Sequence, residues 1–408
     1  MPENTHRIET SHAGSLPRTP ELIAANDARQ LSADGFTLQH TPEFERLLTD
    51  AVVDLVERQQ AIGITLPGDG EFGKAMTSPV DYGAWWSYSF QRVSGLSLTG
   101  DDPFSAAPVR STPGNVQLTT FPDRRDWSIF RDAYTDPTSG ISTGKTATAF
   151  PSTTGPLVYT GYDAIASDIA NLRAGLAASG QPDGFITALS PGSGSRVANN
   201  FYATEEEHIW AWADVLREEY TAIIDAGLLL QIDDPSIAEN WDQINPEPSI
   251  ADYQAFTRIR VEALNHALRG LPEDRIRFHL CWGSWHGPHT TDIELRHIVD
   301  LMLEINAGSY SFEAANARHE HEWRVWNDVA LPEGKLIVPG IVGHATNVVE
   351  HPELVADRIE RFASVVGRER VVAATDCGLG GRVHPHIAWA KLESLARGAE
   401  IASARLWK

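Results

Sequence analysis

The feature that most constrains the fold of this chain is a succession of short apolar runs separated by stretches with helical periodicity. Each run is rich in apolar or β-branched residues and ends in small or polar ones. The clearest six lie at residues 185–190, 228–233, 277–282, 309–314, 335–342 and 370–376. Helical patterns such as 205–226 and 352–366 lie between them. This alternation is typical of β/α units that build a parallel sheet.

Two earlier runs, residues 7–12 and 63–67, raise the number of predicted strands to eight. Eight strands that alternate with helices are the content of a closed β/α barrel, and 408 residues leave room for insertions in such a barrel. We therefore predict an α/β fold, a (β/α)8 TIM barrel, with residues 1–408 forming a single domain.

Residues 81–162 do not follow the alternation. They contain many Pro, Gly, Ser and Thr residues together with aromatic ones, among them Trp85, Trp86 and Trp127. We predict that this segment is an insertion of hairpins or long loops between the second and third strands. Its aromatic side chains would either line a substrate pocket over the barrel mouth or only pack the insertion onto the barrel.

Composition excludes several classes of partner. Acidic residues outnumber basic ones by 55 to 33, and the formal net charge of -22 repels phosphate backbones and anionic lipid surfaces. No apolar run approaches the roughly 20 residues of a membrane span, and the first residues lack a basic and apolar leader. We expect a soluble, cytoplasmic protein with small-molecule partners, and self-association into a homo-oligomer stays open.

The two cysteines, Cys281 and Cys377, are too few for a disulfide framework. Such residues are either buried thiols or ligands in a reducing compartment. Both lie at the ends of predicted strands, where a β/α barrel places its active site. Their position therefore favours a role in the site.

Other ligand types accompany these thiols at the strand ends. His279 lies two positions before Cys281 on the fifth strand, so both side chains face the same way. The sixth strand ends with Glu313, and the eighth ends with Asp376 and Cys377. A His-x-Cys pair alone is more often part of a core. Two thiolates, an imidazole and a carboxylate together suit tetrahedral Zn²⁺, so we predict His279, Cys281, Glu313 and Cys377 as zinc ligands.

Three motifs resemble the zinc-binding, C-terminal barrel of the cobalamin-independent methionine synthase family, whose shorter relatives include epoxyalkane:coenzyme M transferase. They are HLCWG (279–283), SFEAAN (311–316) and TDCG (375–378). HAGSLPRT (12–19), GDGEFGK (68–74) and QIDDP (231–235) resemble the segments that follow the family's first, second and fourth strands. The resemblance covers nearly the whole chain apart from the insertion. It implies the same four zinc ligands, with Glu313 the one that yields to an incoming thiol.

The resemblance also implies roles for residues around the metal. Glu71 and Asp233 would hold the amino group of an amino-acid thiol such as homocysteine, and Ser15 would help to hold its carboxylate. Paired carboxylates suit an ammonium group, although acidic residues at strand ends also cap the helices that follow. His344, in PGIVGHATN (339–347), would supply a proton to the leaving group. Asp376 is the second residue to which we assign a catalytic role.

The predicted function follows from zinc chemistry. A zinc-coordinated thiol is deprotonated at neutral pH, which makes it a nucleophile for an alkyl group. We therefore predict a zinc-dependent S-alkyltransferase, specifically a methyltransferase, whose partners are a small thiol and an alkyl donor.

Several alternatives remain for the reaction. The segment 190–202 offers only Phe201 and Tyr202 where the family stacks a folate on tryptophan, which does not favour a folate donor. Addition of a thiol to an epoxide, or the reverse carbon–sulfur lyase reaction, stays open. So do a zinc hydrolase or lyase, which the two thiolates disfavour, and a non-catalytic relative with a structural zinc.

Overall fold

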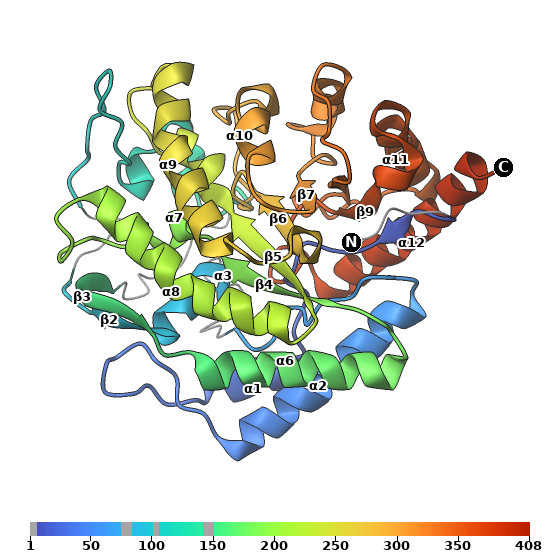
Figure 1. The fold of residues 1–408 in the computed structure, drawn as a ribbon, viewed down its shortest axis with the longest axis horizontal. Coiled ribbons are helices and arrows are strands. Elements are labelled where there is room, and N and C mark those ends of the chain that lie inside the picture. Colours follow the sequence, from blue (N-terminus) through green and yellow to red (C-terminus); the bar gives the residue numbers. More distant parts are fainter. Residues whose placement is uncertain (1–5, 75–83, 101–105, 142–150) are drawn as a thin grey trace.

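The computed structural model describes residues 6–74, 84–100, 106–141 and 151–408 (Figure 1). Its centre is a curled parallel sheet of seven strands in the order β1-β9-β8-β7-β6-β5-β4. These strands are β1 (Glu9–Thr10), β4 (Phe185–Leu189), β5 (Leu229–Asp234), β6 (Ile276–Leu280), β7 (Ser309–Phe312), β8 (Leu336–Val342) and β9 (Val372–Thr375). Consecutive strands pair in parallel and helices lie between them along the chain, so the predicted α/β barrel class is confirmed.

The segment 63–67, predicted as the second strand, is irregular, and that prediction is wrong. It nevertheless lies between β1 and β4. The backbone N–H of Thr65 donates to the carbonyl oxygen of Thr10 at 3.2 Å, and the N–H of Phe185 donates to the carbonyl oxygen of Pro67 at 3.0 Å. Because Pro67 has no N–H, a regular ladder cannot continue through it. The two edges of the sheet are thus joined by hydrogen bonds without an eighth strand.

Long helices surround the sheet (Figure 1). They are α2 (Pro42–Ala61), α6 (Tyr162–Ser179), α8 (Glu205–Asp225), α9 (Ile250–Leu268), α11 (Pro352–Val366) and α12 (Pro385–Leu406). Side-chain oxygens of Thr41, Thr204 and Ser249 cap α2, α8 and α9 by accepting a backbone N–H of the first turn. Their apolar faces pack with the strands in one large core.

The remaining helices are short. The α-helices are α1 (Pro20–Asp27), α7 (Pro191–Gly194) and α10 (Val299–Leu303). The 3-10 helices outside the predicted insertion are η3 (Pro235–Ile237), η4 (Glu239–Trp241), η5 (Glu273–Arg275), η6 (Leu295–His297), η7 (Glu320–Asn327) and η8 (Arg368–Arg370).

The segment predicted as an insertion, 81–162, carries its own small elements. They are α3 (Ala84–Ser87), η1 (Tyr88–Gln91), β2 (Val93–Ser97), η2 (Phe121–Asp123), α4 (Arg125–Ile129), α5 (Arg131–Thr135) and β3 (Ser152–Tyr159). Strands β2 and β3 pair in antiparallel orientation. Residues 81–83, 101–105 and 142–150 of this segment lie outside the described residues. The domain boundaries therefore stay a prediction.

A buried arginine, Arg92, joins the segment 81–162 to two helices of the barrel. Arg92 forms ion pairs with Asp168 of α6 at 2.5 Å and with Glu219 of α8 at 3.2 Å. All three side chains are almost completely buried. Because a buried charge is tolerated only when it is paired, these contacts define how the segment is joined to α6 and α8.

A second buried arginine crosses the interior of the sheet. Arg277 of β6 donates to the hydroxyl of Ser11 at 2.8 Å and to the carbonyl oxygen of His12 at 3.0 Å. Strands β1 and β6 are not neighbours in the sheet. Arg277 therefore ties the strand that carries His279 to the first loop of the chain.

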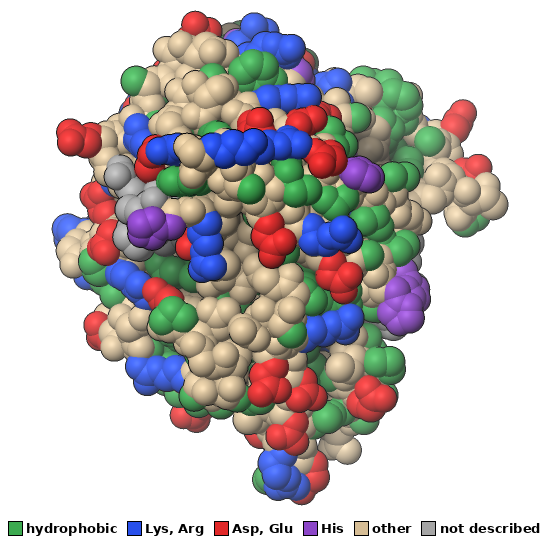
Figure 2. All heavy atoms as spheres, turned by 90° about the vertical axis from the view of Figure 1, so that its right-hand side faces the viewer, with side chains coloured by type: hydrophobic (Ala, Val, Ile, Leu, Met, Phe, Trp, Pro, Cys, Tyr) green, Lys and Arg blue, Asp and Glu red, His purple; other side chains and the backbone are tan. Residues whose placement is uncertain are grey.

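The surface carries both signs of charge. Acidic and basic side chains are interspersed over the face that Figure 2 shows. Ion pairs also link neighbouring helices: Arg405 of α12 lies 3.2 Å from Asp357 and 2.9 Å from Glu360 of α11. Within the described ranges, no helix combines the length and apolarity needed to cross a membrane.

The close packing of α11 on α12 gives a test of the fold. A Cβ atom added to Gly398 would lie 2.2 Å from a methyl carbon of Val355 and 2.9 Å from the carbonyl oxygen of Pro352. Replacing glycine by alanine in a helix normally gains up to about 1 kcal/mol. Here the overlap should dominate, so we expect Gly398→Ala to lower the free energy of unfolding by about 1–3 kcal/mol in urea titrations.

Ala404→Gly provides the control, because Ala404 is exposed on the same helix. It measures the helix-propensity effect without the packing effect. A Gly398→Ala protein that is more stable than wild type would contradict the close helix contact.

Candidate metal centre

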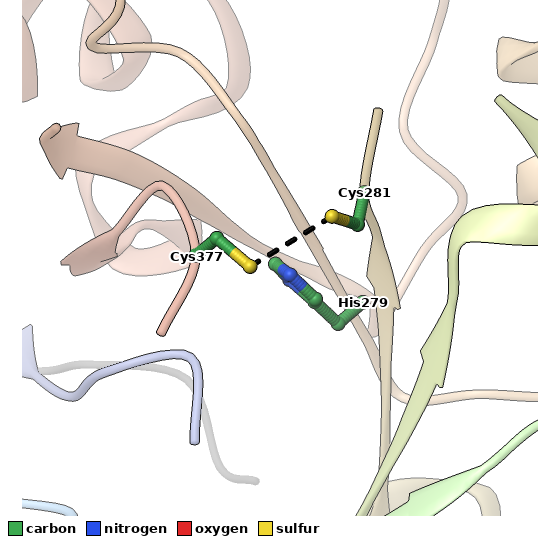
Figure 3. Close-up of side chains that lie close together, drawn as sticks. All are labelled: His279, Cys281 and Cys377. Carbon is green, nitrogen blue, oxygen red and sulfur yellow. Dashed lines mark hydrogen bonds between the residues drawn. The ribbon is translucent and has the colours of Figure 1, made fainter. Parts of the chain in front are cut away.

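Strands β6 and β9 bring together three of the predicted ligands. His279 is the penultimate residue of β6, Cys281 follows its end, and Cys377 lies two residues after β9. Figure 3 shows the three side chains pointing toward one another from these two parts of the sheet. One ring nitrogen of His279 and the two sulfur atoms all lie within 4.8 Å of one another.

The distance between the sulfur atoms is informative. The Sγ atoms of Cys281 and Cys377 are 3.7 Å apart, and both cysteines are free. A disulfide bond would require about 2.0 Å. Two sulfur atoms at about 2.3 Å from one tetrahedral zinc ion lie about 3.8 Å apart, so the observed spacing fits that geometry.

The histidine is held in one orientation. Its Nδ1 atom lies 2.9 Å from the hydroxyl oxygen of Ser311, which is the residue paired with His279 on β7. The buried Nε2 atom has no hydrogen-bond partner in the described part of the chain. A hydrogen bond to one ring nitrogen that leaves the other free is the usual arrangement of a metal-binding histidine.

The two thiols differ in acidity. A hydrogen bond from Cys281, together with the nearby His279 ring, lowers the pKa of Cys377 well below its usual value. The contact with Cys377 and burial raise the pKa of Cys281. One sulfur of the pair is thus already prone to be a thiolate, which is the form that binds metal.

Glu313, His344 and Asp376 form a second group beside the first. Their ligand atoms lie within 4.8 Å of one another, and all three side chains are buried. Asp376 is fixed by two backbone N–H groups, those of Ala314 at 2.7 Å and Ala315 at 2.8 Å. The Nδ1 atom of His344 has no hydrogen-bond partner among the described residues.

Glu313, predicted as the fourth ligand, lies in this second group rather than with the two thiols. One of its oxygens accepts the backbone N–H of Trp282 at 3.0 Å, and the other accepts the amide of Asn316 at 2.7 Å. The same amide donates to Asp376 at 3.2 Å. Burial, followed by the charge of Asp376, raises the pKa of Glu313 to about 8. Its role as a ligand stays a prediction.

Glu71, predicted to bind the amino group of a thiol, is already next to a cation. The buried ammonium group of Lys74 lies 3.4 Å from Oε1 of Glu71, and Thr187 donates its hydroxyl to the same oxygen at 2.8 Å. The backbone of Glu71 adopts a φ angle of +61°, which is rare for a residue other than glycine. Such a conformation is found where surrounding contacts dictate it, often at functional sites.

The other two predicted substrate residues are Asp233 and Ser15. Asp233 is the strand partner of His279, and Gln231 donates to its Oδ1 atom at 2.7 Å. Burial raises the pKa of Asp233 to about 7. Ser15 belongs to the loop after β1, and its carbonyl oxygen accepts the N–H groups of Leu379 and Gly380 at 2.8 and 3.0 Å. Ser15 is therefore held next to the loop that carries Cys377.

The aromatic segment does contribute to a cavity. A cavity of about 480 Å³ is lined by Trp86 and Phe121 of that segment and by Arg196 and Gln243 of the barrel. Arg196 in turn forms an ion pair with Glu239 at 3.0 Å. None of the predicted metal or substrate residues lines this cavity, so a role of the aromatic residues in a substrate pocket stays a prediction.

Sequence reasoning missed Lys74 and Asn316. Each is the last residue of a motif that was recognised, GDGEFGK and SFEAAN. Neither lysine nor asparagine is a usual zinc ligand. Their positions within these motifs also do not reveal which carboxylate each side chain reaches. Only the folded distances identify them as partners of Glu71 and Glu313.

Comparison with protein families gives a direct match. The family described as the catalytic domain of cobalamin-independent synthase matches residues 194–400, which is more than half of the chain. That range contains both of the side-chain groups described above.

Individual proteins also match this chain. A methionine synthase of Thermococcus kodakarensis is 22% identical over 98% of this chain and 94% of its own length. A 2-hydroxypropyl-CoM lyase of Xanthobacter autotrophicus is 25% identical over 51% of this chain and 58% of its own. A B12-independent methionine synthase of a Shewanella species, solved in complex with selenomethionine, superposes with a TM-score of 0.67 at 20% identity, over 98% of this chain and 99% of its own. The last similarity shows the shared barrel fold.

The contact between His279 and Ser311 generates a test of the site. Ser311→Ala should leave the fold intact but free the imidazole ring to rotate, and loss of such a partner typically lowers metal affinity about 10- to 100-fold. Competition with a chromogenic chelator measures the affinity. Ser309→Ala, two residues earlier on β7, is the matched control, and an equal loss in both variants would contradict a specific role for Ser311.

Proposed function

We propose that this chain, which belongs to the family of the cobalamin-independent synthase catalytic domain, is a zinc-dependent methyltransferase that acts on a small thiol. The convergence of His279, Cys281 and Cys377 within 4.8 Å carries the proposal. A methionine synthase that matches almost the whole chain supports the methyl transfer. The thiol and the metal are inferred from the donor set.

The residues present fit a zinc ion. Cys281 and Cys377 would supply two thiolates, and His279 would supply its Nε2 atom, which is buried without another partner among the described residues. Glu313 would complete the set by turning from the Trp282 N–H toward the metal. When bound, zinc would lower the pKa of an incoming thiol so that it is a thiolate at neutral pH.

The chain's own residues would orient the acceptor thiol. Asp233 lies beside His279 in the sheet, so an ammonium group held by Asp233 would lie close to the metal ligands. Glu71 would act with Asp233, although Lys74 already compensates part of its charge. Ser15 would contact the carboxylate of an amino-acid thiol such as homocysteine.

Proton delivery would fall to the second group. His344 is buried close to Glu313 and Asp376, and its Nδ1 atom is not occupied by a hydrogen bond within the described residues. Asp376 is held by the backbone of Ala314 and Ala315, so its position is fixed. We propose that His344 supplies the proton that the leaving group takes up. Asp376 would orient the charged groups around His344.

One observation favours a second candidate. Because the Lys74 ammonium group lies 3.4 Å from Glu71, a thiol with an anionic group and no ammonium group would meet a cation beside Glu71. The similarity to a 2-hydroxypropyl-CoM lyase over half of the chain points the same way. The alternative reaction is addition of such a thiol to an epoxide, or its reversal.

The metal assignment is tested by ligand removal. Cys281→Ser, Cys377→Ser and His279→Asn should each reduce zinc from about one ion per chain to a small fraction, because an incomplete ligand set holds zinc weakly. The barrel should stay folded, since burial of its strands and helices maintains it. Metal analysis and circular dichroism measure the two properties.

His286→Asn is the matched control for His279→Asn. His286 is a half-buried histidine on the loop after β6, outside the proposed ligand set. Full zinc content in both cysteine variants would refute the metal centre.

The acceptor assignment is tested with two thiols that differ only in the amino group, homocysteine and 4-mercaptobutanoate. Asp233→Asn should weaken homocysteine binding by roughly 1.5–3 kcal/mol, about ten- to a hundredfold, because a charge-assisted hydrogen bond is lost. Binding of 4-mercaptobutanoate should change little. Isothermal titration of the zinc-loaded protein measures both affinities.

Asp234→Asn is the control, because neighbouring residues of a strand face opposite ways. Glu71→Gln is a less direct test, since it also removes the partner of Lys74. Equal and mutation-insensitive binding of both thiols would exclude the amine contact, and tighter binding of 2-mercaptoethanesulfonate would favour the second candidate.

A further inference from the structure

The loop that follows β6 contacts a proposed metal ligand directly. The backbone N–H of Gly283 donates to the Sγ atom of Cys281 at 3.3 Å. Gly283 adopts a φ angle of +85°, which side chains other than glycine's rarely allow. A hydrogen bond to a ligand sulfur helps to orient it and adjusts the charge that it offers to a metal.

The ring of Trp285 lies against Gly283. A Cβ atom on Gly283 would lie 2.0 Å from the Trp285 ring, so the indole rests against the glycine. The indole N–H donates to the hydroxyl oxygen of Tyr134 at 2.8 Å. Tyr134 belongs to α5, within the segment 81–162, so this contact joins that segment to the loop beside Cys281.

Asp126 of α4 anchors both Tyr134 and the same loop. Tyr134 donates its hydroxyl to Oδ2 of Asp126 at 2.9 Å, and the backbone N–H of His289 donates to the same oxygen at 3.2 Å. The other oxygen, Oδ1, accepts the N–H of Thr290 at 2.9 Å and its hydroxyl at 2.7 Å. Asp126 is 1% exposed, so water does not compete for these bonds.

A continuous chain of contacts therefore runs from Asp126 through Tyr134, Trp285 and Gly283 to the Cys281 sulfur. We propose that Asp126 and Tyr134 are positioning residues that set the hydrogen bond to Cys281 and thereby the metal affinity of the centre. The inference rests on the proposed metal site. It gives the segment 81–162, which precedes the family match, a role in the chemistry of the barrel.

The test compares two tyrosine hydroxyl groups of the same segment. Tyr134→Phe removes the contacts with Trp285 and Asp126. Tyr159→Phe removes a buried hydroxyl that donates to Glu219 at 2.8 Å, away from the loop, and is the matched control. Asp126→Asn is a second variant, in which an amide NH₂ group, which cannot accept, replaces one of the two accepting oxygens.

Two measurements report on the chain of contacts. Hydrogen–deuterium exchange of residues 283–292 in the metal-free protein should become about tenfold faster in Tyr134→Phe and in Asp126→Asn, and should not change in Tyr159→Phe. Affinity for zinc should fall by about tenfold in the first two variants alone. The sulfur-to-metal absorption bands of the Co²⁺-substituted protein should shift in the same two variants.

Unchanged exchange, affinity and Co²⁺ spectrum in both Tyr134→Phe and Asp126→Asn would overturn the proposal. An equal effect of Tyr159→Phe would also overturn it, because the change would then reflect general loosening. If wild type binds neither zinc nor cobalt, the proposed metal centre fails and the assignment to Cys281 fails with it, while the exchange rates still decide whether the segment holds the loop.

Discussion

The register of the parallel sheet is the constraint on which the candidate site depends. His279 is paired with Asp233 on one side and with Ser311 on the other, so a proposed metal ligand, a proposed substrate residue and the partner of the imidazole lie side by side on three strands. A slip of one residue between two of these strands would turn the side chains of one of them to the opposite face. The sulfur of Cys377 arrives from β9, which is three strands away from β6 in the sheet order. The curvature of the sheet, rather than any local motif, therefore brings the two cysteines to 3.7 Å.

Buried carboxyl groups dominate the region beside this centre. Burial, with the charge of Asp168, raises the pKa of Asp69 to about 7, and burial raises that of Asp233 to the same value. Lys74 lies against Glu71 and also over the ring of Tyr88, at 4.4 Å. The Lys74 charge also acts on Asp69 and Asp233, so one lysine serves more than one carboxyl group. The ammonium group of the proposed amino-acid thiol would therefore compete with Lys74 for the same carboxylates.

The sequence predicted the strands well wherever a run was continuous and apolar, as in 185–190, which matches β4, and 309–314, which contains β7. The spacing of His279 and Cys281 also predicted a shared face, because the two-residue period of a strand is local. The prediction of a strand at 63–67 was wrong, because this segment forms its hydrogen bonds to β1 and β4 without adopting strand geometry. The contact between Glu313 and the N–H of Trp282 could not be predicted, since Trp282 lies 31 residues earlier, at the end of the neighbouring strand. Such a contact follows from distances across the sheet and leaves no periodic signal in the sequence. Asn316 is only three residues from Glu313, but a loop has no fixed period that would predict which side chain its amide reaches.

The amide of Asn316 has a consequence for movement within the site. Its two N–H bonds are divided between two carboxylates, 2.7 Å from Glu313 and 3.2 Å from Asp376. If Glu313 turned toward the proposed metal, one N–H bond of this half-buried amide would lose its acceptor, at a cost of about 1–3 kcal/mol unless Asp376 or a water molecule took it up. A change at one carboxylate therefore reaches the other through Asn316, in addition to the direct effect of the Asp376 charge on Glu313. Asn316 would thus couple the binding of a ligand at the proposed metal centre to the surroundings of Asp376, so that the two change together.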